Sequence, residues 1–99
     1  MSITIIWTYV VADAARAAFE AAYGPNGDWA QLFRKGEGYL GTELLRKADG
    51  GYATLDRWRS EADFDAFKQR FGAEYAALDA VCEKLTSAEQ KIGVFGSVD

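Results

Sequence analysis

The sequence is poor in the residues that bind metals and form cross-links, because its 99 residues include no histidine and a single cysteine. Zinc sites rely on histidine and cysteine, and one cysteine cannot form an internal disulfide. No apolar run approaches the roughly 20 residues of a membrane-spanning helix. The first residues show neither a basic segment nor a cleavage signature, so export is not implied. A dinucleotide or phosphate-binding fingerprint is missing too. These absences predict a cytoplasmic protein with no cofactor (no haem, flavin or zinc) and no membrane partner.

Basic residues are also scarce: 11 lysines and arginines stand against 15 aspartates and glutamates, for a net charge of −4. Because nucleic-acid-binding proteins cluster basic residues against phosphates, this balance argues against a nucleic-acid partner. Aromatic residues are plentiful, with three tryptophans, five tyrosines and six phenylalanines. The length fits a single domain over residues 1–99. The core of so small a domain does not need this many aromatic rings to fill its volume. We therefore expect some of the rings to line a cavity.

The stretch from residue 52 to residue 71 is the most informative part of the chain. Its first half alternates between apolar and polar residues like a strand, and its second half places Phe64, Phe67 and Phe71 at helical spacing. Ser60 stands between the halves, where its hydroxyl can accept a hydrogen bond from the amide of Asp63 in a variant of the capping box. A strand that leads directly into an amphipathic helix predicts a helix folded back over a sheet.

The rest of the chain shows similar periodicities. Apolar patterns predict strands over residues 3–11, 39–47, 52–59 and 91–95. Helices are predicted over residues 14–23, in a short segment that ends by residue 36, and over residues 61–85, where Gly72 is a point of bending. Asp13 and Asp28 are suitable N-caps for the first two helices. The sequence Asp49-Gly50-Gly51 is a hairpin signal between the second and third strands.

This order of elements is that of a ferredoxin-like α+β fold, with a four-stranded antiparallel sheet and helices on one face. Right-handed crossovers place the first and third strands at the centre of the sheet. The face away from the helices is then too apolar to be left in water, with five residues predicted to lie on it: Ile6, Val10, Leu55, Ile92 and Val94. A second copy of the chain, stacked sheet against sheet, would cover this face, so we expect a homodimer.

The joint Arg57-Trp58-Arg59-Ser60, followed by Phe64 and Phe67, resembles the antibiotic biosynthesis monooxygenase (ABM) family, and so does the run from Gly38 to Glu43. The resemblance implies a dimeric α+β barrel with a cavity between the helices and the sheet. It also implies a small-molecule enzyme, a cofactor-independent monooxygenase acting on an aromatic or polyketide-like substrate. The alternative is a non-catalytic dimer that binds a small aromatic molecule or serves as an accessory protein.

The activities known in this family transfer unevenly to the chain. Haem-degrading relatives use an asparagine, a tryptophan and a histidine ligand, whereas Trp7 and Phe67 occupy the first two positions here and histidine is absent. Quinone-forming oxygenases carry an asparagine four residues before the joint tryptophan and a tyrosine six after it. Here Trp58 is kept, but Thr54 and Phe64 stand at those places. The resemblance therefore predicts no haem chemistry. It predicts an oxygenase that differs from the quinone-forming members at Thr54 and Phe64.

Strand alternation places polar and aromatic side chains on the strand face that the family pattern turns toward the helices. With aromatic residues from the other elements they form the predicted substrate-binding wall: Trp7, Tyr9, Trp29, Phe33, Tyr52, Thr54, Trp58, Phe67, Phe71 and Tyr75. Such a wall suits a flat organic molecule held by a few polar groups. The same residue types also build an ordinary aromatic core.

Asp56 and Glu43 are the candidate catalytic residues because both carboxylates lie on strands that the hydrophobic pattern otherwise buries. A carboxylate that faces a core needs a partner or acquires a raised pKa. Each is therefore a candidate general base for proton abstraction from an activated phenol or enol. The alternative for each is an ion pair with a nearby arginine, or a position at the solvated end of the strand.

Overall fold

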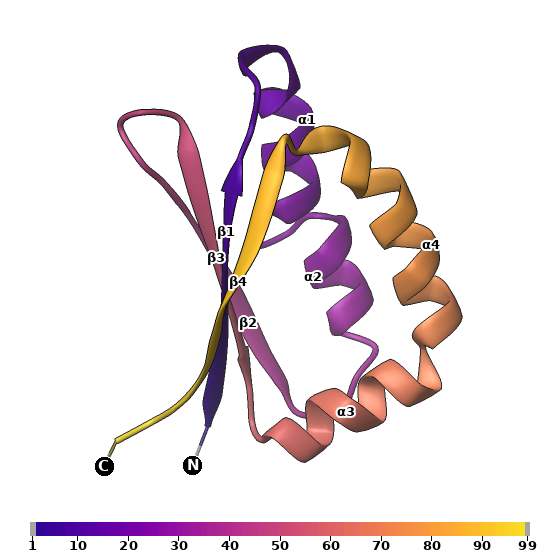
Figure 1. The fold of residues 1–99 in the computed structure, drawn as a ribbon. Helices are drawn as coiled ribbons and strands as arrows, with labels where there is room; N and C mark the ends of the chain where they lie inside the picture. The colour runs from indigo at the N-terminus through magenta and orange to yellow at the C-terminus, as the bar shows by residue number, and fades with distance from the viewer. Residues whose placement is uncertain (1, 99) are drawn as a thin grey trace.

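The computed structural model describes residues 2–98, which form one four-stranded antiparallel sheet covered by helices on one face (Figure 1). The strand order is β2-β3-β1-β4, and the strands are β1 (Ile3–Val10), β2 (Tyr39–Arg46), β3 (Gly51–Trp58) and β4 (Ala88–Gly96). The predicted α+β ferredoxin-like fold, with the first and third strands at the centre, is confirmed.

The helices all lie on the same side of the sheet, and α3 passes across its lower end in Figure 1. In chain order they are η1 (Asp13–Ala15), α1 (Arg16–Tyr23), α2 (Asp28–Phe33), α3 (Glu61–Arg70), α4 (Gly72–Cys82) and η2 (Glu83–Leu85), where η denotes a 3₁₀ turn. None of the helices in residues 2–98 is long and apolar enough to cross a membrane.

The joint between β3 and α3 forms as the sequence predicts. The Ser60 hydroxyl accepts a hydrogen bond from the Asp63 amide at 3.1 Å. The Arg59 guanidinium donates two further hydrogen bonds to the Asp63 carboxylate, at 2.8 and 3.1 Å. The Ser60 bond satisfies a free amide of the first turn, and the three bonds together fix where the helix leaves the sheet.

The two predicted aspartate N-caps are wrong. The capping positions are Ala12 and Gly27, and neither Asp13 nor Asp28 makes a side-chain cap hydrogen bond, because each aspartate lies inside the first turn. Asp13 instead pairs with Arg16 at 2.9 Å. Negative charge in the first turn still favours the helix dipole.

The predicted long helix is interrupted at Phe71, whose φ of −113° and ψ of 25° depart from helical values. Gly72 is the first residue of α4, so the bend lies where the sequence places it. Helix α3 lies at the lower end of the sheet in Figure 1. After the interruption the chain returns as α4 along the helix-covered face of the sheet (Figure 1).

Strand β4 begins at Ala88, three residues before the predicted start. Within residues 2–98 this edge strand pairs with β1 alone. Its first four residues are exposed and mostly polar, so they show no apolar pattern. A β-bulge at Ile92 shifts the register, because Lys91 lies opposite Trp7 but Gly93 lies opposite Ile6.

The bulge changes which face the end of β4 presents. Val94 lies opposite the buried Ile5, on the helix side, so its predicted place on the outer face is wrong. One extra residue reverses the side on which every later side chain points. The predicted Ile6, Val10 and Leu55 do lie on the outer face, which they share with three apolar residues that were not predicted there: Leu45, Ala53 and Phe95.

Candidate functional site

A cavity of about 140 Å³ lies between the helix-facing side of the sheet and helices α1, α2 and α4. Its lining combines aromatic, hydroxyl and carboxyl side chains: Trp7, Tyr9, Tyr23, Trp29, Phe33, Thr42, Thr54, Asp56, Tyr75, Asp79 and Glu89. Apolar cavities of about 150 Å³ accept a benzene molecule. The space therefore suits one aromatic ring, and the polar groups are available to orient it.

Asp56 is the carboxyl group placed deepest in this lining. It is the third residue from the end of β3, directly opposite Ile5 and Thr42 on the neighbouring strands. The Thr42 hydroxyl donates a hydrogen bond to Asp56 Oδ1 at 2.6 Å, and the Tyr39 hydroxyl lies 2.6 Å from Thr42 Oγ1. This chain holds one carboxylate oxygen in place, while no hydrogen bond or ion pair from residues 2–98 engages the other, Oδ2.

Burial raises the pKa of Asp56 to about 6, against the opposing effect of the Thr42 hydrogen bond. The arginine partner that would have lowered this pKa is not found among the described residues. Asp56 is therefore a carboxylate near neutral pH, yet it binds a proton far more readily than an ordinary aspartate. These properties are those of a general base.

The tyrosines of the lining are hydrogen-bond donors and not bases. Burial raises the pKa of Tyr9, Tyr23 and Tyr75, so their hydroxyls stay protonated at neutral pH. The Tyr9 hydroxyl lies 3.1 Å from Thr54 Oγ1, and both groups are buried. Neutral hydroxyls can donate hydrogen bonds to an oxygen of a ligand but cannot serve as bases here.

Six of the ten predicted substrate-binding residues line the cavity: Trp7, Tyr9, Trp29, Phe33, Thr54 and Tyr75. The structure does not bring Trp58, Phe67 or Phe71 to it. Trp58 is fully buried, and its ring centroid lies 5.3 Å from those of both Phe64 and Phe67. These rings fill the end of the domain under α3, so they belong to the core.

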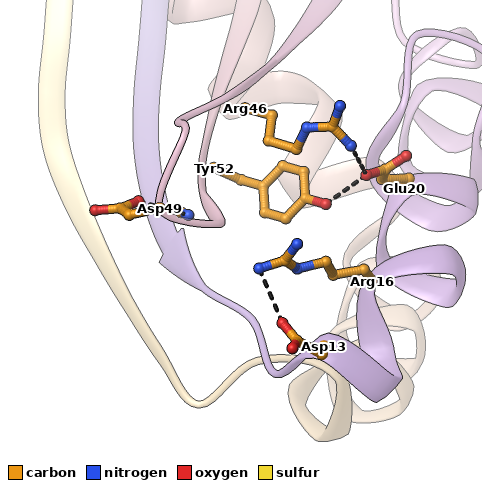
Figure 2. A network of polar contacts seen from close by, with 7 residues as sticks. Asp13, Arg16, Glu20, Arg46, Asp49 and Tyr52 are labelled. Carbon is orange, nitrogen blue, oxygen red and sulfur yellow. Dashed lines mark hydrogen bonds and ion pairs between the residues drawn. The ribbon is translucent and has the colours of Figure 1, made fainter.

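Tyr52 is also drawn away from the cavity. Figure 2 shows its ring extending from β3 toward α1, where its hydroxyl donates a hydrogen bond to Glu20. Arg46 of β2 reaches the same carboxylate at 3.4 Å. The contact fastens α1 to the β2–β3 hairpin. Tyr52 borders a second, open hollow of about 650 Å³ beside that hairpin.

Glu43, the second candidate base, does not reach the cavity. Its neighbour Thr42 points to the helices, so Glu43 points to the outer face, where its Oε1 lies 3.2 Å from Arg57 Nη2. Both side chains are about half exposed. The ion-pair alternative therefore describes Glu43, whereas Asp56 has no such pair among the described residues.

Four lining residues were not predicted: Tyr23, Thr42, Asp79 and Glu89. Two of them could have been predicted from the sequence. Thr42 lies opposite Asp56 in the hairpin register, and Asp79 follows Tyr75 by four residues on α4, so both share a face with a predicted residue. Glu89 lies in the part of β4 that the apolar pattern missed.

The chain matches the family model described as antibiotic biosynthesis monooxygenase over residues 2–77. It belongs to the antibiotic biosynthesis monooxygenase family. The predicted resemblance is thereby confirmed. No curated protein matches the chain at a significant level.

Solved structures share the ABM fold over nearly the whole chain. A mutant of SnoaB, a cofactor-independent oxygenase from Streptomyces nogalater, is similar with a TM-score of 0.80 and 20% identity, covering 99% of this chain and 94% of that one. Rv0793 from Mycobacterium tuberculosis gives 0.70 and 21%, covering 100% and 97%. A putative antibiotic biosynthesis monooxygenase from Bordetella bronchiseptica gives 0.74 and 20%, covering 99% and 98%. Identities this low establish a common fold and leave the activity to the residues of the site.

Proposed function

We propose that the protein is a cofactor-independent monooxygenase that acts on a small aromatic molecule bound between the helices and the sheet. The observation that carries the proposal is Asp56, a carboxylate with a raised pKa and an uncommitted Oδ2, in a cavity walled by aromatic rings. The membership of the ABM family and the shape shared with an oxygenase support the same reaction class.

The reaction begins when Asp56 Oδ2 takes the proton of a phenolic hydroxyl. When the substrate is an electron-rich phenol such as a dihydroxybenzene or a hydroxynaphthalene, its anion can reduce molecular oxygen without a metal or flavin, and a ring carbon then bonds to oxygen. The O–O bond then breaks, one oxygen atom remains as a quinone carbonyl, and the other leaves as water with the two hydrogens that the ring compound loses. Protonated Asp56 supplies one of them and returns to its carboxylate form.

The remaining lining residues have binding roles in this proposal. The rings of Trp7, Trp29 and Phe33 would enclose the substrate ring and exclude water from the reacting anion. The hydroxyls of Tyr9 and Tyr75 would orient its oxygen atoms. Since the cavity has room for about one ring, a larger polycyclic substrate would extend beyond its mouth.

Oxygen uptake with a panel of phenols, dihydroxybenzenes and hydroxynaphthalenes tests the proposal. A positioned base contributes about 10²–10⁴-fold in rate, so Asp56→Asn is expected to reduce uptake by that factor while binding is retained. Glu43→Gln removes a carboxylate from the outer face and serves as the matched control with near-normal uptake. Equal activity of wild type and Asp56→Asn would refute the role of Asp56.

A non-catalytic binding protein is the second candidate. The observation in its favour is that Thr54 and Phe64 stand where the quinone-forming relatives have asparagine and tyrosine. Calorimetric binding of panel members, with no oxygen uptake and no chemical change in any of them, would identify this function.

A further inference from the structure

We propose that the ligand of this cavity is an aromatic amine that binds in its protonated, positively charged form. This inference rests on the proposed function, because it names the class of substrate for the same site. It arises from the combination of charge and ring faces around the cavity, which the family assignment does not specify.

The cavity lining carries negative charge without a compensating cation. Asp56, Asp79 and Glu89 contribute three carboxylates, and the lining contains neither lysine nor arginine. The eight ion pairs found within residues 2–98 all use other carboxylates. Lys91 shares the helix-facing side of β4 with Glu89, but it is exposed and lies outside the lining. The site therefore favours a ligand that brings its own positive charge.

The three carboxylates come from three different elements around the cavity. Asp56 comes from the second half of β3, Asp79 from α4 and Glu89 from the start of β4, and the latter two side chains are exposed at the rim. Within the described part of the chain, no three acidic or cysteine side chains converge closely enough to hold a metal ion. The charge is spread around the cavity and can attract an ammonium group on a ring-sized ligand.

The aromatic side chains add a second source of affinity for a cation. A ring face attracts an ammonium group through its quadrupole, and tryptophan does so most strongly. Trp29 lies edge-on to Tyr75, with ring centroids 5.1 Å apart, and Trp7 stacks near Tyr9 at 6.5 Å. Because these tyrosines stay neutral, their rings and hydroxyls do not add to the negative charge of the carboxylates.

The proposed chemistry gives the ammonium group a further role. When Asp56 removes a phenolic proton, the ligand becomes more negative beside Asp79 and Glu89. Burial raises the pKa of Glu89, and the nearby carboxylates of Asp79 and Glu83 raise it further, so additional negative charge is unfavourable beside it. An ammonium group on the substrate offsets the new charge, so the deprotonated substrate is a zwitterion with no net charge.

Isothermal titration calorimetry near neutral pH with three ligands of the same phenol scaffold tests the inference. Tyramine carries a cationic side chain, tyrosol a neutral one and 4-hydroxyphenylacetate an anionic one. We expect tyramine to bind at least about tenfold more tightly than tyrosol, with 4-hydroxyphenylacetate weakest. Because charge drives the preference, it should shrink as the ionic strength is raised.

Charge-neutralising variants locate the effect. Asp79→Asn and Glu89→Gln each remove a rim charge and should weaken tyramine binding about two- to fivefold, without changing the affinity for tyrosol. Glu61→Gln removes one charge from α3, outside the lining, and should leave both affinities unchanged.

Two results would overturn the inference and separate it from the proposed function. Equal affinities for the three ligands, or tighter binding of the anion, would show that the cavity accepts a phenol ring without preferring a cation, and the oxygenase proposal would stand. Failure of all three to bind at millimolar concentration would refute both the inference and the assignment of this cavity as the substrate site.

Discussion

At the scale of single residues, Asp56 combines a function with a cost to stability. Its pKa is raised from about 3.8 to about 6 in the folded protein, so the folded state binds its proton more tightly than the unfolded state. The stabilising contribution of this proton is complete below about pH 4 and is lost as the pH rises through about 6. Above that pH, folding holds a charge in a poorly solvated place.

At about pH 8 the free energy of unfolding of Asp56→Asn should therefore exceed that of the wild type by up to about 3 kcal/mol. This difference should disappear near pH 4. The asparagine carbonyl oxygen can still accept the Thr42 hydrogen bond, so the packing is preserved. Urea unfolding at several pH values measures the gap. A variant that is less stable than the wild type at every pH would show that Asp56 is a structural residue.

Trp58 and Trp7 should respond differently to the same substitution. Trp58→Phe removes a fully buried ring system from the core and should cost about 1–3 kcal/mol of unfolding free energy with little change in ligand affinity. Trp7→Phe changes the cavity wall and should weaken tyramine binding with a smaller loss of stability. Thermal unfolding and calorimetry on both variants test this. Equal effects of the two would contradict the assignment of Trp58 to the core.

At the scale of secondary-structure elements, the junction between α3 and α4 has room for a more rigid residue. Gly72 starts α4 with a negative φ, and a Cβ added there meets no atom within 4 Å. Gly72→Ala should raise stability by about 0.4–1 kcal/mol by restricting the unfolded chain. Gly38→Ala is the contrasting variant, because Gly38 has φ +89° and its Cβ would lie 2.5 Å from Asp63 Oδ2. Calorimetric melting should move upward for the first and downward for the second, and the opposite pattern would contradict both geometries.

The elements were predictable where one local pattern determines them. The spacing of Phe64, Phe67 and Phe71 and the cap at Ser60 located the joint correctly. The bulge at Ile92 was not predictable, because one extra residue in β4 depends on pairing with a distant strand, and it moved Val94 to the other face. The same limit applied to Glu43, because the alternation of residues along β2 does not show which side of the sheet faces the helices.

The cavity itself was only partly predictable. An aromatic stripe looks the same whether it packs a core or lines a hollow, so Trp58 and Phe67 could not be separated from Trp7 and Trp29 by their spacing. The distinction depends on how the helices settle over the sheet, which is a property of tertiary packing. Asp56 was identified because a carboxylate is unusual on a buried strand face.

At the scale of the whole molecule, the outer face of the sheet remains uncovered in a single chain. Val10 is 57% exposed, Leu45 45% and Phe95 49%, and Leu55 lies among them on the central strand β3. We predict that a second copy covers this face. Leu55→Asp would bury an unpaired charge there at a cost of several kcal/mol, so the variant should be monomeric or unfold.

Val81→Asp is the matched control for this prediction, because Val81 is an exposed apolar residue on α4, 64% exposed. It should leave the subunit number unchanged. Light scattering over a range of concentrations measures the mass of both variants and of the wild type. A monomeric wild type, or a Leu55→Asp variant that keeps the wild-type mass, would contradict the predicted interface.

The pH dependence of kcat/KM for oxygen uptake tests the central claim most directly, with the phenol from the panel that turns over fastest. If Asp56 is the base, the rate is low when its carboxyl group is protonated and rises with pH through an apparent pKa of about 6. Asp56→Asn should lose this acid limb together with about 10²–10⁴-fold of the rate. A wild-type profile that is flat through pH 6, or an Asp56→Asn variant that keeps both the limb and the rate, would contradict the account.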